Sequence, residues 1–248
     1  MDKFQMQDEQ YLFPYHHIPN VDTKNGQLSI IRRLAWGHEY VCYQTHMKLK
    51  IEELNPDSVV EVGCGDGHLI MSLDDKISRK VGVDLSERSI LMANAFNNSN
   101  VEFICDDASN VDGEFDVVVS PEVLEHIPDE GVSDFFRLLD QKCKPGGKIL
   151  ISVPTTNMKL HEKHYRHYDI ELFTKQMKDS GIDCKIETVE YIYHSDWFMK
   201  NFIRFSHNNK WSIEFAFMRK YVWNRVWNKL RFSKPNKGHR LVVLLGKA

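Results

Sequence analysis

Short apolar runs alternate with segments of helical periodicity through the middle of the chain. The apolar runs lie at residues 58–62, 80–84, 101–104, 115–120 and 148–153. Helices are predicted between them, from about His68 and over residues 87–96 and 130–141, and the KPGG sequence at 144–147 predicts a turn. Continuous apolar strands separated by helices are typical of a parallel sheet buried on both faces. The pattern therefore predicts a doubly wound α/β fold.

The flanking segments extend this core. Apolar spacing over residues 29–54 predicts one or two helices, whereas residues 1–30, rich in aromatic, His and Pro residues, predict an irregular arm. Asp169 is a predicted N-cap for a helix that ends before Gly181, and two further strands are expected at 184–191 and 240–246. The chain is expected to comprise an N-terminal arm and helices (1–54), a core (55–193), a basic aromatic insertion (194–239) and the last core strand (240–248).

The fold expected from these elements is a Rossmann-like, doubly wound, mostly parallel seven-stranded sheet. Helices should cover both of its faces, with the arm and a helical insertion before the last strand as additions.

Composition narrows the class of protein. The 248 residues are 42% hydrophobic and 27% charged, which is ordinary for a globular chain. The first ten residues hold no apolar run, and no stretch approaches the roughly 18 apolar residues of a membrane span, so a cytoplasmic protein is expected. Five widely spaced cysteines without a C-x-x-C pair argue against a disulfide framework or a cysteine-rich zinc site.

A glycine-rich turn directly follows the first strand. Its sequence is EVGCGDG, with Gly63, Gly65 and Gly67 at a spacing of two. Such a turn lets a ligand approach the backbone, and the next helix directs its N-terminus at that ligand. Asp84, at the end of the second strand, is placed to accept hydrogen bonds from ribose hydroxyls. Dehydrogenases favour G-x-G-x-x-G instead, so the spacing indicates a different nucleotide cofactor.

Further motifs follow in order: GVD at 82–84, Asp106-Asp107-Ala108 after the third strand, FDVVVSPEVLEHI at the fourth and KPGG before the fifth. Over roughly residues 55–155 the chain resembles the class I S-adenosylmethionine-dependent methyltransferases. The resemblance implies S-adenosylmethionine as cofactor. It places the glycines around the methionine moiety and Glu61 at the loop or the amino group. It also puts Asp84 at the ribose, Leu85 on the adenine, Asp107 and Ala108 at the adenine amino edge, and Ser120 beside the methyl group. Another nucleotide cofactor, or a degenerate non-catalytic copy of the fold, is the alternative.

Two clusters of ionisable residues carry the candidate chemistry. Glu122, Glu125 and His126 fall at helical spacing, and His164 and His167 follow the fifth strand. One interpretation is a divalent-metal site of Glu122, Glu125, His126 and either His164 or His167. That pattern resembles small-RNA 3′-terminal 2′-O-methyltransferases, and E-x-x-E-H alone resembles ubiquinone-pathway O-methyltransferases. In another interpretation the motif merely opens a helix.

We favour a metal-free site in which His126, His164 or His167 is the general base and Glu122 assists. Methyl transfer from a sulfonium also depends on in-line positioning of the acceptor.

The segment before the last strand is basic and aromatic. Residues 197–240 contain eleven Lys and Arg residues and one acid, Glu214, although the whole chain has a net charge of -3. Apolar spacing over 211–230 predicts an amphipathic helix. Three alternatives stay open: a lid packed on the core, a membrane-surface helix within 197–232, and a nucleic-acid contact. The mildly acidic whole disfavours nucleic acid.

The expected activity is O-methylation of a small polar or anionic acceptor, such as a sugar, a glycan or a lipid precursor. The first competing hypothesis is a metal-assisted RNA 2′-O-methyltransferase, and the second is a non-catalytic scaffold. The sequence carries no signal for the oligomeric state.

Overall fold

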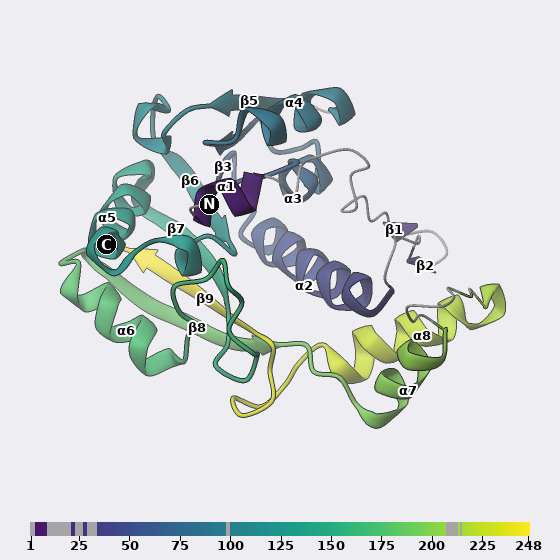
Figure 1. Cartoon of the computed structure of the whole chain (residues 1–248). Coiled ribbons are helices and arrows are strands. Elements are labelled where there is room, and N and C mark those ends of the chain that lie inside the picture. Colours follow the sequence, from purple (N-terminus) through teal and green to yellow (C-terminus); the bar gives the residue numbers. More distant parts are fainter. Residues whose placement is uncertain are drawn as a thin grey trace.

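The computed structural model describes residues 3–8, 21–22, 27–28, 34–97, 100–206, 213 and 215–248. Its centre is a seven-stranded sheet (Figure 1). In spatial order the strands are β5 (Val101–Cys105), β4 (Arg79–Asp84), β3 (Ser58–Val62), β6 (Phe115–Pro121), β7 (Cys143–Pro154), β9 (Arg240–Lys247) and β8 (Cys184–Ile192). β9 runs antiparallel to both of its neighbours, and the other pairs are parallel. The mostly parallel seven-stranded sheet expected from the sequence is confirmed.

Alternate strand residues point to opposite faces of the sheet, and each face has its own core. Val59 and Val117 pack with α2 (Leu34–Glu53) and α3 (His68–Ser72). Val60 and Val118 pack on the other face with α5 (Val132–Lys142) and α6 (Ile170–Asp179). α4 (Glu87–Phe96) lies beside β5 (Figure 1). Helices therefore cover both faces, as predicted.

The insertion between β8 and β9 is helical. It contains α7 (Trp197–Ser206), a 3₁₀ turn (Ala216–Met218), α8 (Arg219–Arg225) and a π-helical turn (Val226–Leu230). The single helix predicted over 211–230 is thus three helical types in succession, and its residues 211, 212 and 214 lie outside the described residues. Its inner residues belong to the same core as α2; they are Met199, Val222, Trp223, Val226 and Leu230.

Two local predictions need correction. The KPGG sequence does not separate α5 from a later strand, because β7 begins at Cys143 and the sequence forms an irregularity in its pairing with β6, around a left-handed Gly146. The arm is not wholly irregular, because residues Lys3–Asp8 form α1 and a short hairpin pairs β1 (Val21–Asp22) with β2 (Gln27–Leu28). The other arm residues, 9–20 among them, lie outside the described residues.

Other local signals are confirmed. Asp169 caps α6 by accepting a hydrogen bond from the Leu172 amide at 2.8 Å, and Gly181 adopts a left-handed conformation after it. Within the described residues, no helix combines the length and the apolar content that a membrane span requires.

Candidate functional site

The glycine loop joins β3 to α3 with all three glycines in the left-handed region. Their φ angles are +76° at Gly63, +54° at Gly65 and +74° at Gly67. A Cβ on Gly63 would lie 2.3 Å from Cγ2 of Val123, and one on Gly67 would lie 2.4 Å from the Phe103 ring. The loop therefore needs glycine for its backbone and for its close packing against the segment after β6.

Two acids hold this loop, the partly buried Asp84 and the buried Glu61. Oδ2 of Asp84 accepts a hydrogen bond from the Gly65 amide at 2.9 Å, and Oδ1 accepts one from the Ser86 amide at 2.8 Å. Oε2 of Glu61 accepts one from the Ile70 amide in α3 at 3.0 Å. Burial raises the pKa of both carboxyls. The predicted ribose acceptor thus lies directly against the loop.

The side chains predicted to contact adenine lie at the ends of β4 and β5. Leu85 leaves an apolar side chain 60% exposed beside Asp84. The Asp107 carboxylate accepts a hydrogen bond from the Ser109 amide at 2.8 Å, and its hydrogen bonds to Ser109 lower its pKa. Ala108 is buried, and the buried Ser120 hydroxyl has no hydrogen-bond partner among the described residues. The cofactor roles of these residues stay predictions.

The segment after β6 does not form the α-helical face predicted for Glu122, Glu125 and His126. Glu122 has a φ of +58°, and only Leu124–His126 form a 3₁₀ turn. This left-handed residue turns the Glu122 side chain away from the other two. Oε2 of Glu122 forms an ion pair with Nε of Arg240 at 2.6 Å, and the Ser152 hydroxyl donates to Oε1 at 3.3 Å.

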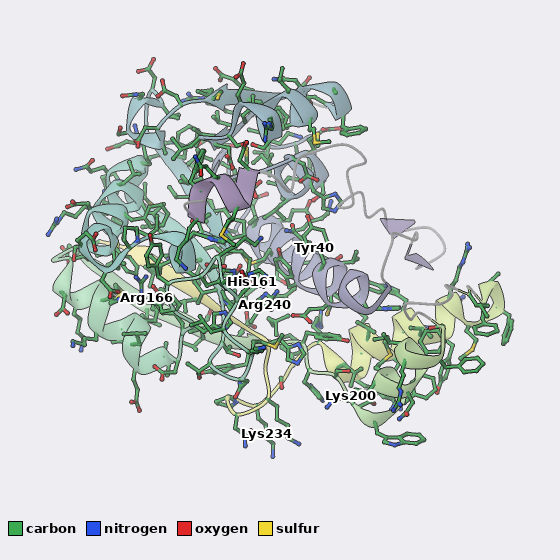
Figure 2. The ribbon with its side chains drawn as sticks, in the orientation of Figure 1. Tyr40, His161, Arg166, Lys200, Lys234 and Arg240 are labelled. Carbon is green, nitrogen blue, oxygen red and sulfur yellow. The ribbon has the colours of Figure 1, made fainter. Side chains whose placement is uncertain are left out.

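Arg240 links Glu122 to helix α2 near the centre of the molecule (Figure 2). Its Nη1 donates to Oε1 of Glu39 at 2.6 Å, and Nδ1 of His239 lies 3.0 Å from Oε2 of Glu39. Although burial opposes the effect, Arg240 and His239 lower the pKa of Glu39. Burial raises the pKa of Glu122 against the effect of Arg240. Neither Glu39 nor Arg240 could be predicted from the sequence, because they lie 201 residues apart and match no motif.

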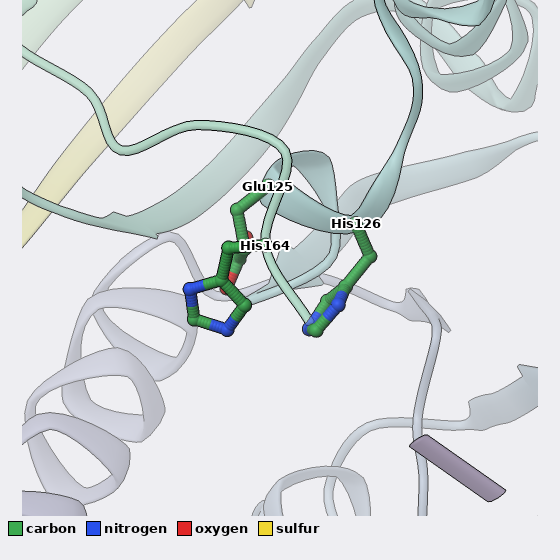
Figure 3. A group of neighbouring side chains, drawn as sticks. All are labelled: Glu125, His126 and His164. Carbon is green, nitrogen blue, oxygen red and sulfur yellow. The ribbon is translucent and has the colours of Figure 1, made fainter. Parts of the chain in front are cut away.

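Glu125, His126 and His164 come together instead (Figure 3). One ligand atom from each lies within 4.8 Å of the other two. Glu125 is buried, and its Oε2 has no hydrogen-bond partner among the described residues. Burial and the nearby Glu122 raise the pKa of Glu125 well above its usual range. The structure thus brings together Glu125, His126 and the His164 alternative of the metal-site interpretation, whereas neither Glu122 nor His167 belongs to this group.

Hydrogen bonds settle which ring nitrogens carry protons. Nδ1 of His126 lies 3.3 Å from the Lys163 carbonyl, and Nδ1 of His167 lies 3.1 Å from the Met158 carbonyl. A carbonyl only accepts, so both of these nitrogens carry the proton. Nδ1 of His164 lies 2.8 Å from Nε2 of His167, and it must donate to that nitrogen if the rings are neutral.

Burial favours the neutral rings. It lowers the pKa of His126 to about 4 and that of His164 to about 3, and it lowers the pKa of His167 as well. Nε2 of His126 and Nε2 of His164 are therefore left as lone-pair atoms. Such atoms can accept a proton or coordinate a metal.

Helix α1 contacts both the loop after β7 and helix α4. Nζ of Lys3 donates to the Glu162 and His164 carbonyls at 2.6 and 2.9 Å, while Asp8 forms an ion pair with Arg88 of α4 at 2.7 Å. The arm thus joins the histidine loop to the element that follows Asp84.

A family model described as a methyltransferase domain matches residues 36–183. The match covers more than half of the chain and includes the glycine loop and the Glu125–His126 segment. The chain belongs to this methyltransferase family. The resemblance to class I methyltransferases given by the sequence motifs is thereby confirmed.

Named relatives share part of the chain. A ubiquinone biosynthesis O-methyltransferase from Idiomarina loihiensis is 32% identical over 108 residues, which are 41% of this chain and 44% of that protein. Phosphoethanolamine N-methyltransferase 1 from Arabidopsis thaliana is 31% identical over 150 residues, which are 53% of this chain and 30% of that protein. These matches span less than half the length of the relatives.

Solved structures confirm the fold. The magnesium protoporphyrin IX methyltransferase from Synechocystis, solved with S-adenosylmethionine, superposes with a TM-score of 0.59 at 15% identity and covers 100% of this chain and 98% of that one. An S-adenosylmethionine-dependent methyltransferase from Clostridium acetobutylicum has a TM-score of 0.55 at 15% identity and covers 84% of this chain and 92% of that one.

Proposed function

We propose that this methyltransferase transfers the methyl group of S-adenosylmethionine to a hydroxyl oxygen of a small polar acceptor. The cofactor part rests on the family, on the left-handed glycine loop and on Asp84 beside that loop. The acceptor part rests on one observation: the rings of His126 and His164 lie with centroids 4.8 Å apart after β6 and β7, and each ring leaves its Nε2 as a lone-pair atom. The relatives named O-methyltransferases agree with this proposal.

In the proposed reaction the acceptor oxygen attacks the methyl carbon in line with the C–S bond. That bond breaks, its electron pair stays on sulfur, and S-adenosylhomocysteine leaves. The hydroxyl proton passes to Nε2 of His164 or His126, each of which carries a lone pair on a neutral ring. The contact between Gly63 and Val123 fixes the cofactor loop three residues from His126 and so supports the alignment of the two reactants.

The first test is calorimetric titration with S-adenosylmethionine and S-adenosylhomocysteine, with NAD as the control. The proposal requires that the first two bind and NAD does not. Transfer of a labelled methyl group should then be measured to catechols, sugars and glycerol phosphates, with phosphoethanolamine as an amine acceptor. Turnover confined to the amine would overturn O-methylation while leaving the cofactor assignment intact.

A metal-assisted variant of this function is supported by a separate observation. Glu125 holds a buried carboxylate oxygen without a described partner next to two imidazole nitrogens, which is a mixed set suited to Mn²⁺, Zn²⁺ or Fe²⁺. A divalent ion held by Glu125, His126 and His164 would lower the pKa of a bound acceptor hydroxyl. Repeating the transfer assay with EDTA, and then with each metal restored, separates this variant from general-base catalysis. The names of the relatives lend no support to an RNA acceptor or to a non-catalytic scaffold.

A further inference from the structure

The α7–α8 insertion has an inner face and an outer face. Met199 of α7 and Val222 and Trp223 of α8 are buried in the core shared with α2. Asp196 and Arg225 form an ion pair that ties the start of α7 to α8. The insertion is thus a packed part of the fold, and its inner face already has a partner within this chain.

The outer face carries large aromatic side chains in water. Trp197 is 79% exposed and Phe217 is 83% exposed, and Phe205 and Tyr221 also lie among the exposed large hydrophobic residues. Phe205 stacks on Phe215 with ring centroids 6.2 Å apart, which joins the end of α7 to the segment that leads into α8. Scattered single apolar residues are normal on a surface, but a group on one helical pair indicates an interaction site.

Basic residues lie between these aromatic residues along the sequence. On α7, Lys200 and Arg204 fall between Trp197 and Phe205 at helical spacing, and on α8 the exposed Lys220 follows Phe217. From 197 to 240 the sequence holds eleven basic residues and one acid. Lys200 and Lys234 both lie in the lower half of Figure 2, on the insertion and on the loop after it. The outer face therefore combines exposed aromatic rings with positive charge.

We propose that this outer face docks the enzyme on an anionic membrane surface. Trp, Tyr and Phe rings enter the headgroup region, while Lys and Arg side chains pair with lipid phosphates. A second copy of the chain fits poorly, because two basic faces would repel each other. The whole chain has a net charge of -3 and residues 197–240 contribute +10, so the rest of the chain carries -13. A long nucleic acid that extended beyond the insertion would be repelled by this negative charge. The insertion projects at one end of the molecule, so a flat surface can approach its outer face (Figure 1).

The test is sedimentation of the full chain with vesicles of phosphatidylcholine, alone or mixed with phosphatidylglycerol. Binding should favour the anionic vesicles and weaken with added salt. Trp197→Ser combined with Phe217→Ser should reduce the partition coefficient at least about tenfold, since each ring would otherwise leave water. Lys200→Glu combined with Lys220→Glu should remove the preference for anionic lipid.

Phe96→Ser is the control, because Phe96 is an aromatic residue on α4 that is 49% exposed and lies outside the insertion. It should leave vesicle binding unchanged. All variants should keep the wild-type circular dichroism spectrum and affinity for S-adenosylmethionine. No binding of the wild type to anionic vesicles, or equal binding by the aromatic variant, overturns the proposal.

Two further results would also overturn it. One is tighter binding of the wild type to a labelled RNA oligonucleotide than to vesicles, with loss in the same variants. The other is a wild-type dimer in light scattering that the aromatic variant converts to a monomer. Vesicle binding is measured without an acceptor, so this proposal can fail while the proposed O-methylation holds. Equally, O-methylation can fail while vesicle binding holds.

Discussion

Nδ1 of His164 lies 2.8 Å from Nε2 of His167, which in turn is oriented by the Met158 carbonyl. The His164 ring also offers a nitrogen to the group that it forms with Glu125 and His126. In the proposed reaction His167, predicted as a candidate base, therefore positions His164 instead. The His167 ring is in turn oriented by a backbone carbonyl.

Replacing His164 by Ala should reduce kcat by roughly 10²- to 10⁴-fold, the usual contribution of a general base. Affinity for S-adenosylmethionine should stay unchanged, because the glycine loop and Asp84 are untouched. His161→Ala is the control, since its ring lies 5.5 Å from that of His164 but lies outside the Glu125, His126 and His164 group. Steady-state kinetics of both variants check this, and an unimpaired His164→Ala enzyme would transfer the role to His126.

Gly63→Ala should weaken cofactor binding, because the new Cβ would meet Cγ2 of Val123 at 2.3 Å. Gly146→Ala is a matched control: its φ is also +76°, but nothing lies within 4 Å of the added atom. Both variants carry the same backbone strain, but Gly146 lies in β7 and not in the cofactor loop. Gly146→Ala should therefore leave the calorimetric affinity unchanged. Adding Val123→Ala should restore part of the loss, and a double variant no better than Gly63→Ala would contradict the packing argument.

Asp84→Asn should weaken S-adenosylmethionine binding roughly ten- to a hundredfold, equivalent to the loss of one charge-assisted hydrogen bond. The amide keeps the size of the carboxylate but has a single acceptor oxygen, so only one of the Gly65 and Ser86 amides keeps its acceptor. Thermal unfolding serves as the check on the fold. Unchanged affinity would mean that the ribose lies elsewhere.

Local sequence predicted the geometry of the glycine loop well, because each feature there depends on neighbours in the chain. Three glycines at fixed spacing produced three left-handed residues, and Asp84 ends its strand beside them. The acceptor side depends on long-range contacts. Glu122 was expected beside His126, but its left-handed backbone and its ion pair with Arg240 turn it toward α2. Arg240 belongs to the last strand, so no spacing pattern around Glu122 predicts this ion pair.

Arg240→Met should destabilise the fold by about 3 to 5 kcal/mol, because it leaves Glu39 and Glu122 as buried carboxylates without their cation. Urea unfolding measures the change. Combining it with Glu39→Gln and Glu122→Gln removes the unpaired charges and should recover much of the stability. A triple variant as unstable as the single one would show that Arg240 acts by packing instead, for example on the Tyr43 ring 5.5 Å away.

The histidine pair should also make stability depend on pH. In the unfolded chain an imidazole titrates near its ordinary pKa of 6.5, whereas burial lowers the folded pKa of His126 to about 4 and that of His164 to about 3. Between these values the unfolded chain binds more protons than the folded one, so the contribution of the pair is complete above pH 6.5 and falls as the pH drops towards 4. Glu61 and Glu125 have raised pKa values and act in the opposite sense, so only a difference between variants isolates the imidazoles.

Urea unfolding of the wild type and of the double variant His126→Gln with His164→Gln measures this effect. The difference between their free energies of unfolding should shrink from pH 7 to pH 4.5. Parallel curves would mean that folding leaves the pKa values of both imidazoles unchanged, which would overturn the account of two rings held neutral by burial.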